Sequence, residues 1–252
     1  IEVNGVDARS QSLGMSLREG GTVTEANLGS AIGFDDLTVN GYTIDLNGIS
    51  SADGSQAMDQ IVDAISARYA DTEVQAERAS ESEVTIASAD TTNNAGSSSI
   101  TINNVDIDIA ASASDEDIAN AINSYAGQTG VSAEVDGGVK LTGDGVDIDV
   151  STDGSSILGG PDEYYRGIEL VSEPGNDIEV GGDAATSLQL DGATVENRRV
   201  SGVDVLSREA SSEAIRTMDQ AIQMVNDARS ELGATQNRFE STISNLEVTS
   251  EN

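Results

Sequence analysis

The feature that most constrains this chain is a stripe of residues near its carboxyl end. Positions spaced alternately by three and four residues are apolar, with two polar exceptions, and the pattern continues without a slip from residue 215 to residue 246. An a/d heptad of this length predicts one long α-helix in a bundle or coiled coil. The stripe consists of Ile215, Met218, Ile222, Val225, Arg229, Leu232, Gln236, Phe239, Ile243 and Leu246.

The predicted helix is too long to cover its own stripe. With Ser207 as its N-cap and Leu246 near its end, it would extend about 60 Å at a rise of about 1.5 Å per residue. It requires partner helices for helix packing or a subunit interface, and the rest of the chain offers only two short ones.

Three positions interrupt the apolar character of this helix. Arg229 and Gln236 occupy stripe positions, where the partner surface ends, water enters, or a polar side chain fixes the register. Gly233 lowers helix propensity by about 1 kcal/mol. It fits either a close approach of another backbone or a tolerated weak spot, and the sequence favours neither interpretation.

A second constraint is an internal repeat. Residues 37–46 align with residues 100–109 at an offset of 63, and residues 61–65 align with residues 118–122 at an offset of 57. The difference between the offsets fits a longer loop at 47–56 in the first copy. Two copies of one supersecondary unit are the economical interpretation.

Each copy predicts a ββαββ module. Alternating apolar residues indicate half-buried strands, and Asn40-Gly41 or Asn103-Asn104 supplies a positive-φ hairpin turn between them. Ser114 followed by acidic residues predicts a capped helix start. A Gly137-Gly138 turn then predicts a second hairpin, so the module belongs to the α+β class.

The remaining segments predict a β-rich domain that is discontinuous in sequence. We expect strands in residues 1–35 to pair with strands in 153–205, including one at Leu188 and Leu190 before an Asp191-Gly192 turn. The predicted α+β fold therefore has modules at 36–93 and 94–152, a β-rich outer domain at 1–35 with 153–205, and a long C-terminal helix within 206–252.

The charge balance excludes several partners. The chain has 12 Lys and Arg against 45 Asp and Glu, a net charge of −33. A nucleic-acid partner is excluded because phosphate binding needs clustered basic residues. No run of 18 apolar residues is present, which predicts no membrane span. For Arg198-Arg199, the only adjacent basic pair, we expect a surface ion pair.

The absence of His and Cys restricts the chemistry further. Without them there is no imidazole base, thiolate nucleophile or usual zinc site. We predict no enzyme activity and no catalytic, cofactor or metal site. Residues 142–149 are rich in Asp and Gly like a calcium loop, but they lack the EF-hand spacing and its terminal Glu. A Gly turn before a strand is the simpler interpretation, and weak cation binding by acidic loops stays open.

Two stretches resemble a known family. The run Ile-Asn-Asn-Val-Asp-Ile at 102–107, then Ala-Ile-Asn at 121–123 and Val-Ser-Ala-Glu-Val at 131–135, resembles the hook IN motif of bacterial flagellins and some filament-cap proteins. Residues 99–150 match this motif closely and residues 36–88 more loosely. Residues 218–246, with Arg-Ser-Glu-Leu-Gly-Ala-Thr-Gln-Asn-Arg-Phe at 229–239, resemble the C-terminal conserved region of flagellin.

The resemblance implies a self-assembling structural subunit of the extracellular flagellar filament, used in motility. The helix would be the C-terminal helix of the inner D1 domain, which packs on two N-terminal helices and meets other flagellin subunits. Residues 1–17 are similar to the stretch that follows those helices, so we expect a truncated, non-polymerising fragment without them or the D0 tails. The resemblance also implies recognition of intact D1 by an innate Toll-like receptor, with Asn237 and Arg238 as candidate surface residues.

Other roles share these features. A hook–filament junction protein has similar helical ends, although the match at 232–246 favours flagellin. Adhesion to sugars through the outer modules has no motif beyond surface exposure. Surface Ser and Thr residues could carry O-linked sugars, which the sequence does not decide.

The net charge predicts that folding depends strongly on salt. Uncompensated carboxylates repel one another in dilute salt, and ions screen this repulsion beyond about 8–10 Å at physiological ionic strength. We expect the thermal unfolding midpoint to rise steadily from low to molar NaCl, as in a protein from a marine or salt-loving source. A midpoint that stays flat across this range would refute the expectation.

Overall fold

The structure is a computed structural model that describes residues 9–34, 36–87, 98–152, 162–206 and 208–251. Contacts between residues divide the chain into two compact units. The first comprises Ile1–Leu17, Ser172–Asp177 and Glu196–Asn252, and the second comprises Arg18–Val171 and Ile178–Val195. Within the described ranges, no helix combines the length and apolarity needed to cross a bilayer.

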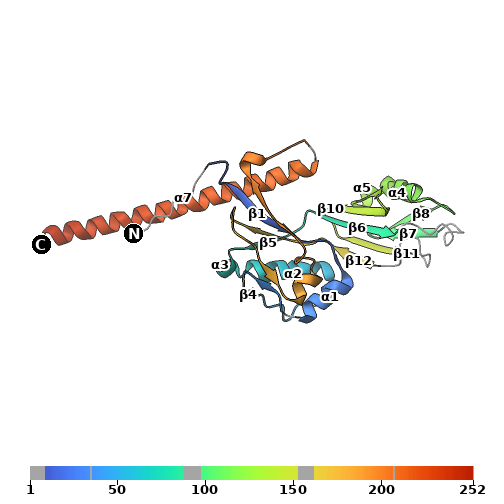
Figure 1. Cartoon of the computed structure of the whole chain (residues 1–252), viewed down its shortest axis with the longest axis horizontal. Helices are drawn as coiled ribbons and strands as arrows, with labels where there is room; N and C mark the ends of the chain where they lie inside the picture. The colour runs from blue at the N-terminus through green and yellow to red at the C-terminus, as the bar shows by residue number, and fades with distance from the viewer. Residues whose placement is uncertain (1–8, 35, 88–97, 153–161, 207, 252) are drawn as a thin grey trace. The chain divides into compact units, whose positions relative to one another are not determined.

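The first unit contains the predicted long helix. Figure 1 shows α7 (Arg208–Glu251) as one continuous helix. This confirms the predicted element, whereas its predicted N-cap, Ser207, and residues 1–8 lie outside the described residues. In the same unit, β1 (Gly14–Glu19) neighbours β15 (Val195–Arg199), and η1 (Val200–Gly202) follows.

A glycine allows the close approach of β1 and β15. A Cβ atom on Gly14, which has a φ of 149°, would lie 2.1 Å from the carbonyl oxygen of Arg198. Only glycine fits this backbone conformation and spacing. The backbone N–H of Val200 then donates to the carbonyl of Leu13 at 3.0 Å, which fixes η1 beside the start of β1.

The second unit contains both repeats. Its first elements are β2 (Val23–Thr24), α1 (Glu25–Phe34), β3 (Thr38–Val39), β4 (Tyr42–Thr43), α2 (Gly54–Ser66), α3 (Tyr69–Thr72) and β5 (Gln75–Arg78). The second repeat follows with β6 (Glu81–Ala87), β7 (Ser98–Ile102), β8 (Val105–Ile109), α4 (Asp115–Ser124), α5 (Ala126–Thr129), β9 (Val131–Val135), β10 (Gly138–Asp144) and β11 (Ile148–Thr152). The last elements are β12 (Asp162–Tyr165), β13 (Ile168–Ser172), β14 (Val180–Gly181) and α6 (Asp183–Ser187).

The second repeat has the predicted ββαββ order. Asn103 and Asn104 have φ values of 47° and 65°, as a tight turn between β7 and β8 requires. The Ser114 hydroxyl accepts the backbone N–H of Asp117, and the Asp117 carboxylate accepts the N–H of Ser114. This capping box begins α4 as predicted, and Gly130, with a φ of 72°, ends α5.

Each repeat contributes equivalent residues to its own hydrophobic core. The offsets of 63 and 57 found in the sequence relate residues that are at most 2% exposed in both cores. These pairs are Leu37 and Ile100, Val39 and Ile102, Ile44 and Ile107, Leu46 and Ile109, Ile61 and Ile118, Ile65 and Ile122, and Val74 and Val131.

The repeats also share polar contacts that the sequence alignment did not reveal. The side-chain amide of Asn40 donates to the carbonyl of Thr72 at 2.9 Å, and Asn103 donates to that of Thr129 at 2.9 Å. Ser66 bonds both backbone groups of Ala76. Asn123 likewise bonds both backbone groups of Ala133. A side chain in the last turn of each helix therefore covers one edge of the neighbouring strand, which blocks pairing there with another chain.

The strand pairing differs from the predicted module boundaries. Those boundaries placed residues 81–87 in the first module, but β6 pairs with β10 of the second repeat. In the first repeat, β5 pairs with β13 and β3 pairs with β14, both far along the chain. Strand periodicity identifies a strand but not its partner. The domain boundaries themselves stay a prediction.

Two helices replace predicted strands. Residues 25–34 form α1, where the Thr24 hydroxyl accepts the N–H of Asn27 and Leu28 and Ala31 are buried one turn apart. Residues 183–187 form α6, so the strand predicted at Leu188 and Leu190 is wrong. The alternating leucines lie in a turn after α6 and are both buried. Short helices of this kind give little periodic signal.

We expect acid to weaken the contact that begins α6. Asp36 accepts the backbone N–H groups of Asp183 at 2.8 Å and Ala184 at 2.9 Å. These bonds, Ala184 first, hold the pKa of Asp36 below its ordinary value of 3.8. The ionised carboxylate therefore stabilises the fold above pH 3.8, and this stabilisation is lost as the pH falls through the lower folded-state value.

Urea unfolding of Asp36→Ala against the wild type measures this contribution. The difference between their midpoints should be full at pH 6 and shrink towards zero near pH 2. Asp36→Asn keeps the shape of the side chain and one acceptor but not the charge. Its urea midpoint should therefore lack the pH-dependent stabilisation that the ionised Asp36 gives the wild type. A difference that is the same at both pH values would contradict the assignment.

Candidate functional site: the exposed helix stripe and a charged junction

Most of the predicted stripe on α7 is exposed to solvent. Its largest apolar members are between 41% and 63% exposed, while Val225 is half-buried and Arg229 and Gln236 are exposed. The side chain of Leu246 lies outside the described residues. The exposed members are Ile215, Met218, Ile222, Leu232, Phe239 and Ile243. The role of this stripe as a helix-packing and subunit interface stays a prediction.

A different line of residues attaches α7 to its own unit. Ala214, Thr217 and Ala221 are buried, and the Thr217 hydroxyl donates to the carbonyl of Glu213 at 2.9 Å. Because these side chains are small, the backbone of α7 can lie close to η1 and β15. The helix therefore uses small residues inside the unit and leaves its large apolar residues available for other contacts.

An ion pair beside this line confirms the expectation for Arg198. Its guanidinium contacts the carboxylates of Glu196, at 3.2 Å, and Glu213 on the first turns of α7. These residues line a cavity of about 460 Å³ between β15, η1 and α7. Because Arg198 contacts a carboxylate on β15 and another on α7, this ion pair links the strand to the helix.

The two candidate receptor residues are on the exposed surface of α7. Asn237 and Arg238 are both exposed. The backbone carbonyl of Arg238 accepts the Thr242 hydroxyl at 2.8 Å one turn later. Their side chains are therefore accessible in this unit, and their contact with a receptor stays a prediction.

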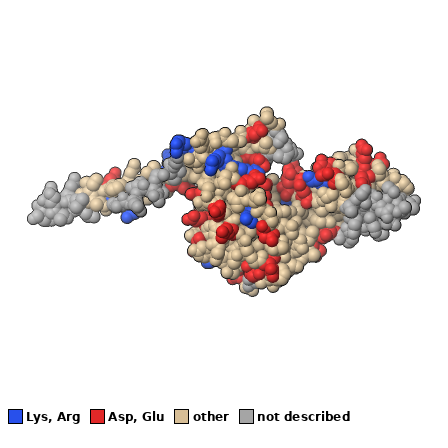
Figure 2. All heavy atoms as spheres, viewed as in Figure 1, with Lys and Arg blue, Asp and Glu red and all other residues tan. Residues whose placement is uncertain are grey.

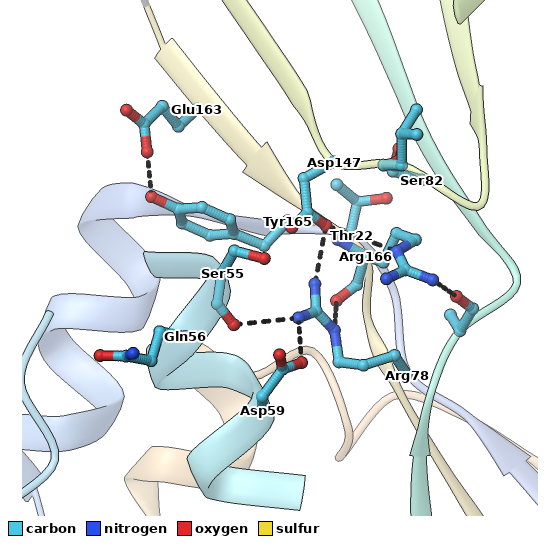
Figure 3. A network of polar contacts seen from close by, with 12 residues as sticks. Thr22, Ser55, Gln56, Asp59, Arg78, Ser82, Asp147, Glu163, Tyr165 and Arg166 are labelled. Carbon is cyan, nitrogen blue, oxygen red and sulfur yellow. Dashed lines mark hydrogen bonds and ion pairs between the residues drawn. The ribbon is translucent and has the colours of Figure 1, made fainter. Parts of the chain in front are cut away.

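A charged network at the junction of the two repeats was not predicted from the sequence (Figure 3). Arg78 is at the end of β5, and its side chain is only 9% exposed. It contacts the carboxylate of Asp59 on α2 at 2.9 Å and that of Asp147, just before β11, at 2.7 Å. It also donates to the carbonyl of Ser55 at 3.2 Å. One guanidinium thus joins the helix of the first repeat to a loop of the second.

The chain crosses between the repeats twice at this network. Arg78 Nε donates to the carbonyl of Arg166 at 3.2 Å, and Arg166 Nη1 donates to that of Ala79 at 3.3 Å. Ala79 N–H also donates to the carbonyl of Gly167 at 2.9 Å. Asp147 accepts the backbone N–H of Arg166 at 2.7 Å. The outgoing and returning segments are therefore bonded to each other and to the same carboxylate.

One strand serves both hydrophobic cores at this junction. In β12, Tyr164 packs against the core of the second repeat, whereas Tyr165 is 4% exposed in the core of the first. A Cβ atom on Gly54 would lie 2.0 Å from the phenol of Tyr165, so glycine is required where the ring meets the start of α2. Adjacent side chains of a strand point to opposite faces, which lets β12 connect the two cores.

Carboxylates surround a cavity next to this strand. Asp149 and Glu163 are directly opposite each other in β11 and β12, and both line a cavity of about 500 Å³ with Asn104 and Ser55. Burial, and then the charge of Glu163, raises the pKa of Asp149. Burial also raises the pKa of Tyr165, whose hydroxyl donates to Glu163. Among the described residues, no group of three or more acidic side chains could hold a metal ion.

The scarcity of cations is the signal that could have revealed the junction. Between Arg78 and Arg166 the only basic residue is Lys140, and each of the two arginines marks one crossing of the chain. Asp147 was hidden in the Asp- and Gly-rich loop, where composition resembles a calcium loop. In the structure Gly145 forms the turn with a φ of 70°, and Asp147 faces the two arginines.

Comparisons with known proteins agree with the fold and with the exposed helix. Residues 215–252 match the bacterial flagellin C-terminal helical region, and residues 83–145 match the flagellin hook IN motif. Flagellin A of Vibrio anguillarum is 35% identical over 85 residues, which are 33% of this chain and 22% of that protein. The B-type flagellin of Pseudomonas aeruginosa is 25% identical over 185 residues, which are 61% of this chain and 38% of that protein.

The structure thus combines ββαββ repeats with a long carboxyl-terminal helix whose large apolar residues are exposed. Two segments of the chain are thus similar to bacterial flagellins: the second repeat matches the hook IN motif, and α7 matches the C-terminal helical region. The matched part spans between about a fifth and two fifths of the length of these relatives.

We expect Asp147→Asn to weaken the junction. The substitution leaves the largely buried Arg78 with one carboxylate fewer, and disrupting such a pair costs about 2–3 kcal/mol after allowance for partial exposure. The urea midpoint should fall accordingly. Asp149→Asn is the matched control in the same cavity, because it removes a charge that opposes Glu163, and it should be neutral or stabilising. Equal losses from both variants would show that the network is not specific.

Proposed function

We propose that this chain is part of a flagellin subunit that self-assembles into the extracellular filament used for bacterial motility. Within that subunit, the α7 stripe packs against helices of the inner domain and of neighbouring subunits. The repeats form the outer surface. The function is structural, with no reaction catalysed, and the partners are other flagellin subunits.

The exposed stripe within the matched C-terminal region carries this proposal. Burying one large apolar side chain contributes about 1.5–3 kcal/mol, so the six exposed members of the stripe supply a large driving force for helix packing. A monomeric protein rarely leaves such a continuous apolar surface open to water. The spacing of the stripe over several heptads fits a helix or helix bundle rather than a small ligand.

The acidic surface supports an outward position for the repeats. On the face shown in Figure 2, Asp and Glu side chains are numerous and Lys and Arg are few. Close packing of such surfaces costs electrostatic free energy, whereas contact with water does not. The apolar helix is therefore the better assembly element, and the acidic modules are the better solvent-facing element.

Substitutions on α7 in the motile bacterium test the assembly role. Ile222→Asp and Leu232→Asp place a charge in the stripe and should abolish filaments seen by electron microscopy and swimming in soft agar. Gln223→Asp and Ser230→Asp add the same charge at exposed positions outside the stripe, and they should leave filaments intact. Normal filaments with Ile222→Asp and Leu232→Asp would overturn the proposal.

We also propose that Asn237 and Arg238 belong to a surface that an innate Toll-like receptor contacts in the intact inner domain. The support is their exposure on α7 together with the match to the flagellin C-terminal region. Because the other helices of that domain would share the surface, this 252-residue chain alone should give weak or no signal. A receptor-expressing reporter cell line, treated with nanomolar chain, measures this. Full activation would contradict the requirement for additional helices.

A further inference from the structure

The first repeat obtains two of its strands from beyond the second repeat. In the second repeat, β9 pairs with β10 so that Ala133 is opposite Leu141 and Val135 is opposite Val139. In the first repeat, β5 pairs with β13 so that Ala76 is opposite Leu170 and Arg78 is opposite Ile168. The offset of 57 relates Ala76 to Ala133 and Arg78 to Val135, so β13 has the place of β10.

The closing strand follows the same rule. Val180 in β14 is opposite Val39, as Val150 in β11 is opposite Ile102. Asn40 exchanges two bonds with the backbone of Glu179, at 2.8 Å each. Asn103 makes the same exchange with Asp149, at 2.8 and 3.0 Å. Both strands of the first repeat that come after β5 are therefore supplied by residues 168–181.

The second repeat thus occupies a hairpin turn of the first. Between the paired strands, the second repeat has only the turn residues 136–138, whereas the first repeat has all of residues 79–167. The bond from Ala79 N–H to the carbonyl of Gly167 continues the pairing of β5 and β13. The host strands keep their hairpin register although a complete second core is inserted between them.

The equivalent turn of the second repeat has the properties of an unused insertion point. Asp136 and Gly137 are exposed. Gly137 has a φ of 67°, and a Cβ atom there would meet no other atom within 4 Å. The turn closes with one bond, from Asp136 N–H to the carbonyl of Gly138 at 3.0 Å. Gly138 already belongs to β10, where it is opposite Ala87 of β6, so a segment placed between Asp136 and Gly137 enters before that pairing begins.

The hairpin turn at Asn103 and Asn104, between β7 and β8, is different. Besides its exchange with Asp149, the Asn103 side chain donates to the carbonyl groups of Thr129 and Asp147 at 2.9 and 3.1 Å. These bonds connect the turn to the end of α5 and to the start of β11. An insertion there would break them and leave buried backbone groups without partners.

From this internal precedent we propose that the turn at Asp136 and Gly137 is the attachment point through which the second repeat accepts a further module. The segment that fits is one whose two ends lie side by side, as residues 79 and 167 do. The entropic cost of closing the loop between two paired strands grows only slowly with the length of the loop. The two host strands and the second core therefore remain formed after insertion. This inference concerns folding and does not depend on filament assembly.

Two insertions in the 252-residue chain test the proposal. A flexible Gly/Ser segment of about twelve residues is placed between Asp136 and Gly137, and the same segment between Asn103 and Asn104 is the matched control. At the first position the thermal midpoint should fall by less than about 8 °C, and at the second it should fall by more than about 15 °C. Amide hydrogen exchange of β9 and β10 should remain slow only in the first variant.

A third variant carries a folded insert. A second copy of residues 79–167 is placed between Asp136 and Gly137. Amide hydrogen exchange should then remain slow at Val139 and Leu141 of the original second repeat, which shows that this repeat is still folded. Loss of this protection in both the flexible and the folded insertion would overturn the proposal. Equal tolerance of the two turns would overturn it as well, because the Asp136 turn would then have no special role.

Discussion

A helix that exposes its large apolar residues is the constraint on which the rest of this molecule depends. Small residues, Ala214, Thr217 and Ala221, are buried in the unit that contains α7, so that unit covers little apolar surface of the helix. The large apolar residues of the stripe, from Ile215 to Ile243, therefore stay exposed to solvent. Each of these side chains that a partner helix covers would contribute about 1.5–3 kcal/mol, and the proposed assembly relies on this contribution.

The two repeats have to stay folded while the chain carries a large negative charge. Their cores use the same positions in both repeats, and the same side-chain bonds hold the edges. Asn40 and Asn103 fix the first hairpin to the end of the helix, and Ser66 and Asn123 occupy the backbone groups of an edge strand. These bonds oppose edge pairing with other chains, which fits the proposed assembly through the helix rather than through the repeats.

The elements with strong local signals could be predicted from the sequence. The heptad predicted α7, and the Asn-Asn and Gly-Gly turns predicted two hairpins of the second repeat, because turn chemistry and periodicity act over a few residues. The pairing of β5 with β13 could not be predicted, since the residues involved are separated by a whole module. The helix α1 was missed because Gly29 and Gly33 weaken its propensity, although Leu28 and Ala31 are buried on one face.

The candidate sites divide in the same way. The exposed stripe follows from spacing alone, whereas the junction depends on Asp147 meeting Arg78, and no local pattern records which loop reaches which strand. Because the chain has few basic residues, the places where they contact carboxylates matter for its stability. Three of the basic residues each contact carboxylates from two elements: Arg78 with Asp59 and Asp147, Lys140 with Glu83 and Glu134, and Arg198 with Glu196 and Glu213.

Because the cations lie at contacts between elements, the chain gains attraction inside the fold while its surface remains negative. A cation between two carboxylates removes their mutual repulsion at a joint, where a partly buried position also strengthens the attraction. The same cation placed on the open surface would gain little, because exposed pairs contribute less than about 1 kcal/mol. A chain with 12 basic and 45 acidic residues can therefore hold its repeats together while its surface stays strongly negative, as the proposed solvent-facing position of the repeats requires.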